Sequence, residues 1–304
     1  MTVIDIAKEL IGFDTSGPPT RERPCAEWIR DFLEDLDVDA DLQLVDEDRA
    51  NVIAKIGEGG GPGLLMSGHI DVVPAGDPEL WTVTHPFEPM VKDGRLYGRG
   101  ACDMKGPDAC ILQAFKELSG EDFRRQLSLV FTSGEDTGGW YVREVLEEGR
   151  ITKEDAMYGV IPEPSMMEIV RCHKGTGTAL VRVEGRAVHS SMPELGVNAI
   201  LKASKIIQEV AKLQDGLKEV DHPLLGHTTI KPTIIEGGFK SNIIPDRCEI
   251  TINSRLVPQH AGGPYPRRWI QDIIDDLWEE DPDFRAWIER CSSNPALDVA
   301  EDSG

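Results

Sequence analysis

Helix and strand patterns alternate along the first 150 residues, and this alternation restricts the possible folds more than any other feature of the chain. Apolar residues three and four positions apart predict helices, whereas short runs rich in valine, isoleucine and leucine predict buried strands. This order predicts an α/β layer fold, in which helices on both faces cover a mostly parallel sheet. The expected helices span residues 4–10, 26–36, 104–118 and 140–148, and the expected strands span residues 51–56, 63–69 and 127–132.

The pattern changes at about residue 174, which marks the expected start of a second domain. The remaining elements follow the order β-α-β-β-α-β, which predicts two helices packed on one antiparallel sheet. The chain is therefore expected to divide into a first domain at 1–173, a second domain at 174–291 and a polar linker at 292–304. The expected strands of the second domain span residues 178–184, 227–235, 248–255 and 284–290, and its expected helices span residues 198–213 and 268–278.

The chain carries a formal net charge of −22, from 54 acidic and 32 basic residues. Such a negative field repels nucleic acid and anionic membranes, so neither is an expected partner. A dense acidic surface also suits a protein that stays soluble in concentrated salt, where its self-repulsion is screened. The charge therefore fits either a halophilic source or an ordinary acidic cytosolic protein.

Several features of the sequence bear on location. No apolar run reaches the roughly 18 residues that a membrane helix requires. The N-terminal residues have neither the cationic flank nor the cleavage pattern of a signal peptide. Six cysteines are scattered without any Cys-x-x-Cys pair, which predicts buried, free thiols and a reducing compartment. Together these features predict a cytoplasmic protein.

Acidic and imidazole groups follow the predicted strands of the first domain. His69 and Asp71 lie two residues apart, so on an extended chain they share a face. This spacing lets a carboxylate hold an imidazole in one tautomer while the other ring nitrogen binds a metal. A structural histidine beside a turn aspartate is the alternative. Asp103 opens a helix after a glycine-rich turn, where it could also serve as an N-cap.

Two further strand ends carry carboxylates. Glu135 and Asp136 are adjacent after a buried strand, and Glu163 stands between two prolines. Since ligand groups gather at the carboxyl ends of strands in α/β folds, we expect these residues to converge with His69 and Asp103. Converging acids repel each other unless cations neutralise them, so the pattern predicts a metal site. Histidine and carboxylate ligands without thiolate suit zinc, with cobalt or manganese as alternatives.

In these motifs the chain resembles the M20 metallopeptidase family, which includes acetylornithine deacetylase, succinyl-diaminopimelate desuccinylase, aminoacylase and carboxypeptidase G-type enzymes. His-x-Asp, Gly-Arg-Gly-x-x-Asp-Met-Lys-Gly, an acidic pair and Glu-Pro-Ser occur in the family's order between residues 1 and 290. The resemblance implies a zinc-exopeptidase-like sheet domain with an inserted lid and dimerisation domain. It also implies a homodimer that hydrolyses an amide bond in an N-acyl amino acid or a small peptide.

The resemblance further implies two zinc ions bridged by Asp103 and a water. One ion would be held by His69 with Glu163 or Asp136. The other would take the remaining carboxylate and a histidine near the family's C-terminus. Two metals at this spacing activate the bridging water and polarise the scissile carbonyl. The resemblance also implies a cis peptide bond between Asp103 and Met104.

Other residues receive roles from the same resemblance. Asp71 would orient the metal-bound histidine, and Glu135 would act as the general base. In relatives, the histidine at the position of His189 reaches into the partner subunit's site and stabilises the oxyanion, a task that suits an imidazole donor. Asn242 and Arg255 lie where relatives bind the substrate's carboxylate, which an arginine can bind through two parallel hydrogen bonds.

Two features depart from the family pattern. Asp136 stands where the family usually has glutamate and is one methylene shorter, so it fits either a metal ligand or a neighbour of the ligands. No histidine follows His260, so the last metal ligand is expected to be missing, and an apolar patch is expected where the missing segment would pack. Three alternatives stay open: a deacylase, a dipeptidase or carboxypeptidase of the same family, or a truncated, inactive remnant that still dimerises.

Overall fold

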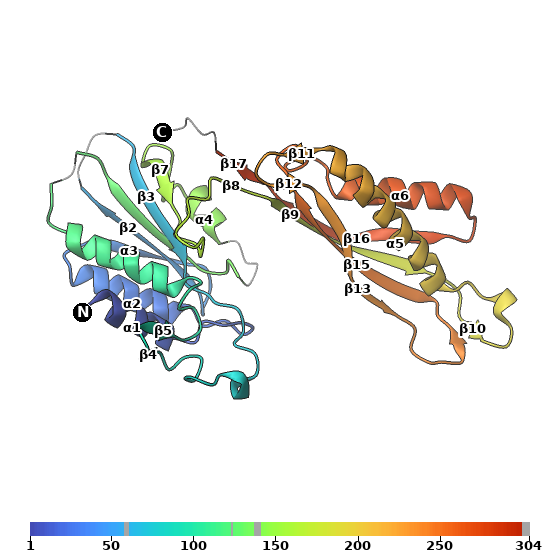
Figure 1. Ribbon diagram of the computed structural model, residues 1–304, viewed down its shortest axis with the longest axis horizontal. Coiled ribbons are helices and arrows are strands. Elements are labelled where there is room, and N and C mark those ends of the chain that lie inside the picture. Colours follow the sequence, from blue (N-terminus) through green and yellow to red (C-terminus); the bar gives the residue numbers. More distant parts are fainter. Residues whose placement is uncertain (58–60, 123, 137–140, 300–304) are drawn as a thin grey trace. The chain divides into compact units, whose positions relative to one another are not determined.

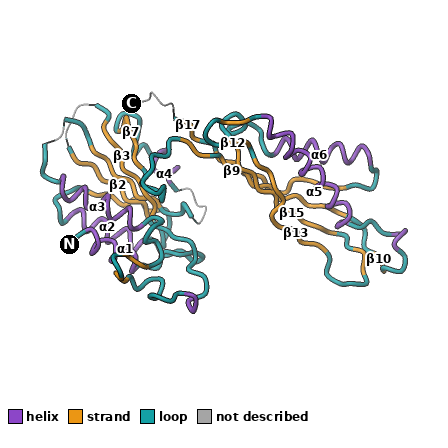
Figure 2. The backbone as a smooth tube through the Cα atoms, in the orientation of Figure 1, coloured by secondary structure: helices purple, strands orange, loops and turns teal. Residues whose placement is uncertain are grey.

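The computed structural model describes residues 1–57, 61–122, 124–136 and 141–299 (Figures 1 and 2). The chain divides into two compact units, Met1–Glu168 and Ile169–Gly304. Each unit has its own sheet, its own helices and its own apolar core. A separate core in each unit is what a chain of two domains requires.

The first unit is built on a five-stranded sheet with the order β1-β2-β6-β3-β7. Strand β3 is parallel to β6 and β7, whereas β2 is antiparallel to both β1 and β6. Four of the five strands therefore run in the same direction, and the expectation of a mostly parallel sheet holds. Strand β2 is the exception that makes the sheet mixed, because the apolar pattern of a strand reports its burial and not the direction of its neighbours. The strands are β1 (Ala40–Leu44), β2 (Ala50–Ile56), β3 (Gly63–His69), β6 (Leu127–Thr132) and β7 (Ala156–Val160).

Helices cover both faces of this sheet, as expected (Figure 1). α1, α2 and α3 pack on one face, where Leu10, Ile29 and Phe115 belong to the main core. α4 packs on the opposite face, where Val145 belongs to a smaller cluster with Ile53. The helices are α1 (Val3–Gly12), α2 (Arg23–Glu34), α3 (Lys105–Leu118) and α4 (Val142–Glu147).

The second unit has the predicted β-α-β-β-α-β order. Its four strands are all antiparallel to their neighbours in the order β13-β15-β9-β16. α5 and α6 lie on one face of this sheet (Figure 1), where Ile206 and Ile274 share a core with Val181 and Ile250. The elements are β9 (Gly175–Glu184), α5 (Ala199–Gly216), β13 (Thr229–Gly237), β15 (Arg247–Leu256), α6 (Arg267–Glu280) and β16 (Arg285–Asn294).

The end of the second unit differs from the expectation. β16 continues to Asn294, and β17 (Leu297–Asp298) pairs with β8 (Cys172–His173). Part of the expected linker at 292–304 is therefore strand, because backbone pairing with β9 does not need the apolar side chains by which strands are recognised in a sequence. Residues 300–304 of that linker lie outside the described residues.

Short elements complete the fold. The expected helix at 140–148 is observed as α4, and its first expected residue, Trp140, lies outside the described residues. No helix in the described part of the chain is long and apolar enough to cross a membrane. The short strands are β4 (Met90–Lys92), β5 (Arg95–Tyr97), β10 (Val188–His189), β11 (Asp221–His222), β12 (Gly226–His227) and β14 (Ile243–Ile244), and the 3₁₀ turns are Pro78–Leu80, Pro193–Leu195 and Leu217–Glu219.

An exposed apolar face lies along β7, which is an edge strand of the sheet in the first unit. Met157, Tyr158 and Val160 on this strand are each about half exposed, and the neighbouring Ile161 is more exposed still. Apolar side chains on an open sheet edge form a surface that another element can cover. The described part of this unit therefore exposes apolar side chains, whereas the packing of a further segment on them stays a prediction.

All six cysteines are free thiols, as expected. Cys25, Cys172 and Cys248 are buried, whereas Cys102 and Cys110 are exposed. The expectation that the thiols are buried therefore holds only in part, because scattered cysteines in a sequence carry no periodic pattern that would show which face of an element they occupy.

Candidate metal centre

One edge of the sheet in the first unit carries the predicted site residues. β6, β3 and β7 are neighbours and run parallel, so their carboxyl ends lie at the same edge. His69 is the last residue of β3, and Glu135 and Asp136 follow β6. Glu163 follows β7, and Asp103 lies just before the start of α3. The topology alone therefore directs these five residues toward one place.

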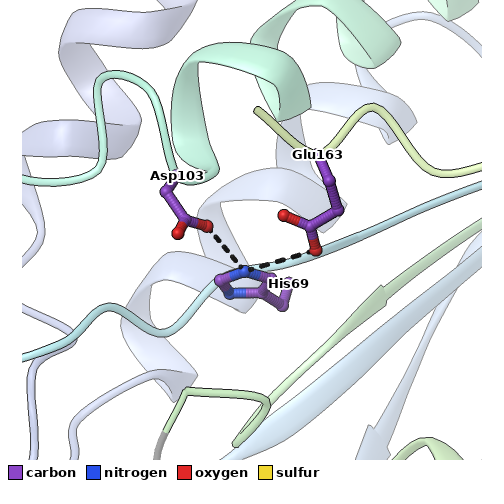
Figure 3. A group of neighbouring side chains, drawn as sticks. All are labelled: His69, Asp103 and Glu163. Atoms are coloured by element: carbon purple, nitrogen blue, oxygen red, sulfur yellow. Dashed lines mark hydrogen bonds and ion pairs between the residues drawn. The ribbon is translucent and has the colours of Figure 1, made fainter. Parts of the chain in front are cut away.

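Figure 3 shows the Nε2 atom of His69 facing two carboxylates. This atom lies 3.1 Å from Oδ1 of Asp103 and 3.9 Å from Oε1 of Glu163. It also lies 3.9 Å from Oε2 of Glu135. Ligand atoms of His69, Asp103 and Glu163 lie within 4.8 Å of one another, and so do those of His69, Glu135 and Asp136. The five side chains converge, as the sequence predicts.

Each of these two groups has the dimensions of a site for one metal ion. Ligand atoms about 2.1 Å from a tetrahedral zinc ion lie about 3.4 Å from one another, so small side-chain shifts adapt either group. Asp136 reaches its group although it is one methylene shorter than the expected glutamate. Both groups use His69, whose Nε2 has one lone pair and can bind one ion at a time.

Asp71 holds two parts of the site. The Nδ1 atom of His69 lies 3.0 Å from the backbone oxygen of Asp71 and 3.5 Å from its Oδ1. With Nδ1–H donated to these oxygens, Nε2 is left free to bind a metal. The same Oδ1 accepts a 3.0 Å hydrogen bond from the backbone N–H of Glu135. This second contact was not predicted, because a sequence pattern does not show which loop lies beside a strand end.

His69 and the carboxylates around it shift one another's pKa values. Burial lowers the pKa of His69, but the Asp71 carboxylate and the surrounding acids outweigh burial and raise it to about 10. Burial raises the pKa values of Glu135, Asp136 and Glu163, the His69 charge lowers them, and the neighbouring carboxylates raise them again. A cation at the centre of this group would favour the ionised carboxylates and replace the proton on the imidazole.

The glycine-rich turn before α3 brings Asp103 to the sheet edge. A Cβ atom on Gly106 would lie 2.1 Å from the backbone oxygen of Ala101, so only glycine fits this packing. The peptide bond between Asp103 and Met104 is cis, as predicted. The motif thus has a local structural reason for one of its glycines.

The predicted residues of the second unit fall into two places. His189 is exposed at the end of β10, and its Nε2 lies 3.5 Å from Nδ2 of Asn242. Asn242 precedes β15, whereas Arg255 lies near the other end of that strand. At about 3.3 Å per residue, the two ends of β15 are roughly 30 Å apart. The structure therefore brings His189 and Asn242 together and places Arg255 apart from them.

Taken together, the fold and the site define an α/β protein with a candidate metal centre at the carboxyl edge of its sheet. A family model described as peptidase family M20/M25/M40 matches residues 65–286, more than half of the chain. This chain therefore belongs to the M20 peptidase family, and the resemblance expected from the motifs is confirmed.

Relatives similar in sequence are probable succinyl-diaminopimelate desuccinylases. The protein from Staphylococcus epidermidis is 31% identical over 276 residues, which cover 83% of this chain and 66% of that protein. One from Staphylococcus aureus is 32% identical over 275 residues, which cover 82% of this chain and 66% of that protein. The chain thus spans about two thirds of the length of these relatives.

Solved structures share the fold. The M20 family metallo-carboxypeptidase Sso-CP2 from Sulfolobus solfataricus matches with a TM-score of 0.77 and 19% identity, over 99% of this chain and 80% of that one. The YXEP protein from Bacillus subtilis, a dinuclear metal binding peptidase of the M20 family, matches with a TM-score of 0.61 and 17% identity, over 97% of this chain and 74% of that one. At these identities the matches show the fold, and the expected α/β class is confirmed.

Proposed function

We propose that this chain is a metal-dependent hydrolase that cleaves the amide bond of an N-acyl amino acid, as a deacetylase or a desuccinylase does. The convergence of one histidine and four carboxylates at one sheet edge is the observation that carries this proposal. The similarity to probable desuccinylases supports the reaction class. In this proposal residues 1–173 form the catalytic domain, and residues 174–291 form a lid and dimerisation domain.

The donor set fits two zinc ions, with cobalt or manganese as alternatives. His69, Asp103, Asp136 and Glu163 would hold the metal, with Asp103 shared between the two ions. Bound metal would lower the pKa of a coordinated water and polarise the carbonyl of the scissile amide. Burial and the neighbouring carboxylates raise the pKa values of Asp136 and Glu163, and this supports the proposal because a bound cation would favour their ionised forms.

Glu135 supplies the general base in this proposal. Its side chain is about half exposed and lies 3.9 Å from Nε2 of His69, so a substrate and a water can reach it. As the water oxygen bonds to the carbonyl carbon, Glu135 takes the water's proton. It then gives a proton to the nitrogen as the carbon–nitrogen bond breaks, which releases a carboxylate and an amine. The hydrogen bond from the backbone of Glu135 to Asp71 holds this base beside the ligands.

The proposal includes a homodimer. Asn242 and Arg255 are proposed to bind the substrate's carboxylate, yet they lie at opposite ends of β15, and one small substrate cannot reach both within one chain. A second subunit would resolve this separation, with His189 of one subunit stabilising the oxyanion in the partner's site. Sedimentation at micromolar concentration tests the dimer: a dimer is expected, and a monomer would refute this part of the proposal.

A panel of substrates tests the reaction. N-Acetyl and N-succinyl amino acids are offered to the zinc-loaded protein beside dipeptides and peptides with a free C-terminus. Release of the acyl group supports the deacylase. Cleavage of peptides alone would support a dipeptidase or carboxypeptidase, which can use the same ligands and the same base. Arg255 favours a substrate with a free carboxylate in either case.

An inactive, dimerising remnant is the remaining alternative. The number of zinc ions bound per chain separates it from an enzyme: about two tightly bound ions are expected for the proposed site, and one or none for a remnant. The count does not depend on the choice of substrate, so it decides between enzyme and remnant even where the panel misses the natural acyl group.

We also infer a cytoplasmic, salt-adapted protein that binds neither nucleic acid nor membranes. The net charge of −22 and the free cysteines support this inference. Stability that rises with potassium chloride up to molar concentrations is expected, because salt screens the repulsion among the acids. Stability that falls over this range would contradict a halophilic source.

A further inference from the structure

The segment that carries Glu135 begins where strand pairing stops. The last paired residues of β2 and β6 are Val52 and Phe131. Beyond them, the backbone N–H of Ser133 donates a 2.9 Å hydrogen bond to Oδ1 of Asn51. The side chain of Asn51 thus takes the place of the next backbone acceptor between the two strands, at the point where the chain turns toward the site.

Asn51 is fully buried and also holds the other end of the same segment. Its Nδ2 donates to the backbone oxygen of Tyr141 at 3.2 Å and to Oε1 of Gln43 at 2.9 Å. Gln43 is the partner of Asn51 across the β1–β2 pair, so the amide is fixed from its own sheet. Ser133 and Tyr141 bracket the segment that carries the proposed base.

Only an amide meets these three demands. It presents one acceptor and two donors in one plane, so it can accept from one backbone group and donate to two other oxygens at once. An aspartate offers no donor, and a leucine of similar volume offers neither. A buried backbone or side-chain group that is left without its hydrogen bond destabilises the fold, so the three contacts favour asparagine at this position.

We propose that Asn51 is a positioning residue for Glu135 and Asp136. Its amide holds the backbone of Ser133, two residues before Glu135, and the backbone of Tyr141, and so sets the distance of the base and the ligand from His69. The kinetic part of this inference rests on the proposed function. The structural part, that one buried amide clamps the backbone at Ser133 and at Tyr141, does not.

The kinetic test compares Asn51→Leu with wild type and with Gln214→Leu. Gln214 is a matched control, because it is a buried amide of the second unit that donates to the backbone of Thr228 and accepts from that of Ile230. We expect Asn51→Leu to lower kcat about 100-fold, as small misplacements of a catalytic group do, with KM changed less than about threefold. Gln214→Leu should leave both within about twofold. Equal losses in the two variants, or a loss confined to KM, would overturn the proposal.

Hydrogen exchange tests the clamp without any substrate. In Asn51→Leu, the amides of Ser133 and Glu135 should exchange at least about tenfold faster than in wild type, while those of α5 in the second unit do not change. Unchanged exchange at Ser133 overturns the proposal. If wild type hydrolyses nothing, the proposed function fails, and the exchange result alone decides the role of Asn51.

A milder variant keeps the test open where Asn51→Leu does not fold. Gln43→Leu removes one partner of Nδ2 and leaves Asn51 in place. It should loosen the amide, raise exchange at Ser133 and lower kcat by a smaller factor, on the order of 3–10-fold, since the other two contacts remain. A variant with wild-type exchange and wild-type kcat would contradict the clamp.

Discussion

Buried charge separates the two units of this molecule. The first unit fully buries Glu22, Asp71, Lys105 and Asp108. In the second unit, no carboxylate, lysine or arginine among the described residues is buried, and its buried polar groups are amide, hydroxyl and imidazole groups such as that of Gln214. Burial of charge is unfavourable unless it is compensated. The first unit, which contains the candidate site, therefore loses folding free energy through its buried charges, and the second unit does not.

Two acids show the difference most clearly. In the first unit, burial raises the pKa of Glu22 to about 7, although contacts with Ser133 and Arg49 oppose the shift. In the second unit, hydrogen bonds from Lys202 and Lys205 lower the pKa of Asp281 to about 2. The ionised carboxylate of Glu22 therefore destabilises the first unit, whereas that of Asp281 stabilises the second unit. Stability should respond to pH with opposite signs at these two positions.

The largest effect is expected at the proposed base. Glu135→Gln removes the proton acceptor and keeps the size of the side chain, so kcat should fall roughly 10²–10⁴-fold. The matched control is Glu289→Gln in the second unit, an acid on β16 paired with Arg182, which should leave kcat within about twofold. Steady-state kinetics on the zinc-loaded proteins measures both. A similar fall of kcat in Glu289→Gln would contradict the assignment of the general base to the first unit.

Glu22→Gln should raise the free energy of unfolding of the first unit at high pH. The unfolded state ionises near 4.5 and the folded state near 7, so wild-type stability falls as pH rises through this window. The neutral variant does not suffer this loss, and above pH 7 it should be more stable by about 3 kcal/mol. Urea unfolding of the metal-free proteins at pH 4 and pH 8 measures the change. A variant no more stable than wild type at pH 8 would show that the Glu22 carboxylate is compensated.

Asp281→Asn should give a smaller effect of the opposite sign. The folded pKa of about 2 lies below the ordinary 3.8, so the stabilisation by Asp281 is complete above that value and is lost as pH falls toward 2. Lys202 and Asp281 keep some solvent exposure, so the loss at pH 7 should be about 1–2 kcal/mol. Thermal unfolding at pH 7 and pH 2 tests this. An equal loss at both pH values would exclude the ion pair as its cause.

The sequence predicted the content of the site better than its surroundings. His69, Asp103 and Glu163 were predictable because each follows a strand or opens a helix, and the ends of neighbouring strands meet wherever the sheet is parallel. The second contact of Asp71 and the clamp at Asn51 were not predictable, because they join strands far apart in the chain. An asparagine at the start of an apolar run carries no signal of its partner.

The fold shows the same division between local and distant information. The order of elements in the second unit follows from local periodicity and is confirmed. The direction of β2 and the extension of β16 to Asn294 depend on which backbone lies alongside, and both differ from the expectation. The separation of Arg255 from Asn242 likewise follows from the length of a strand and not from a motif.

The central claim is the metal centre, and zinc binding to His69→Gln tests it most directly. Nε2 of His69 can bind one ion at a time, so His69→Gln should remove the ion that it holds and, through the shared Asp103, weaken the other. Glu163→Gln keeps this histidine and should disturb one group only. After equilibrium dialysis we expect about two zinc ions per wild-type chain, fewer in Glu163→Gln and the fewest, about one or none, in His69→Gln. Wild-type zinc content in the His69 variant would contradict the account.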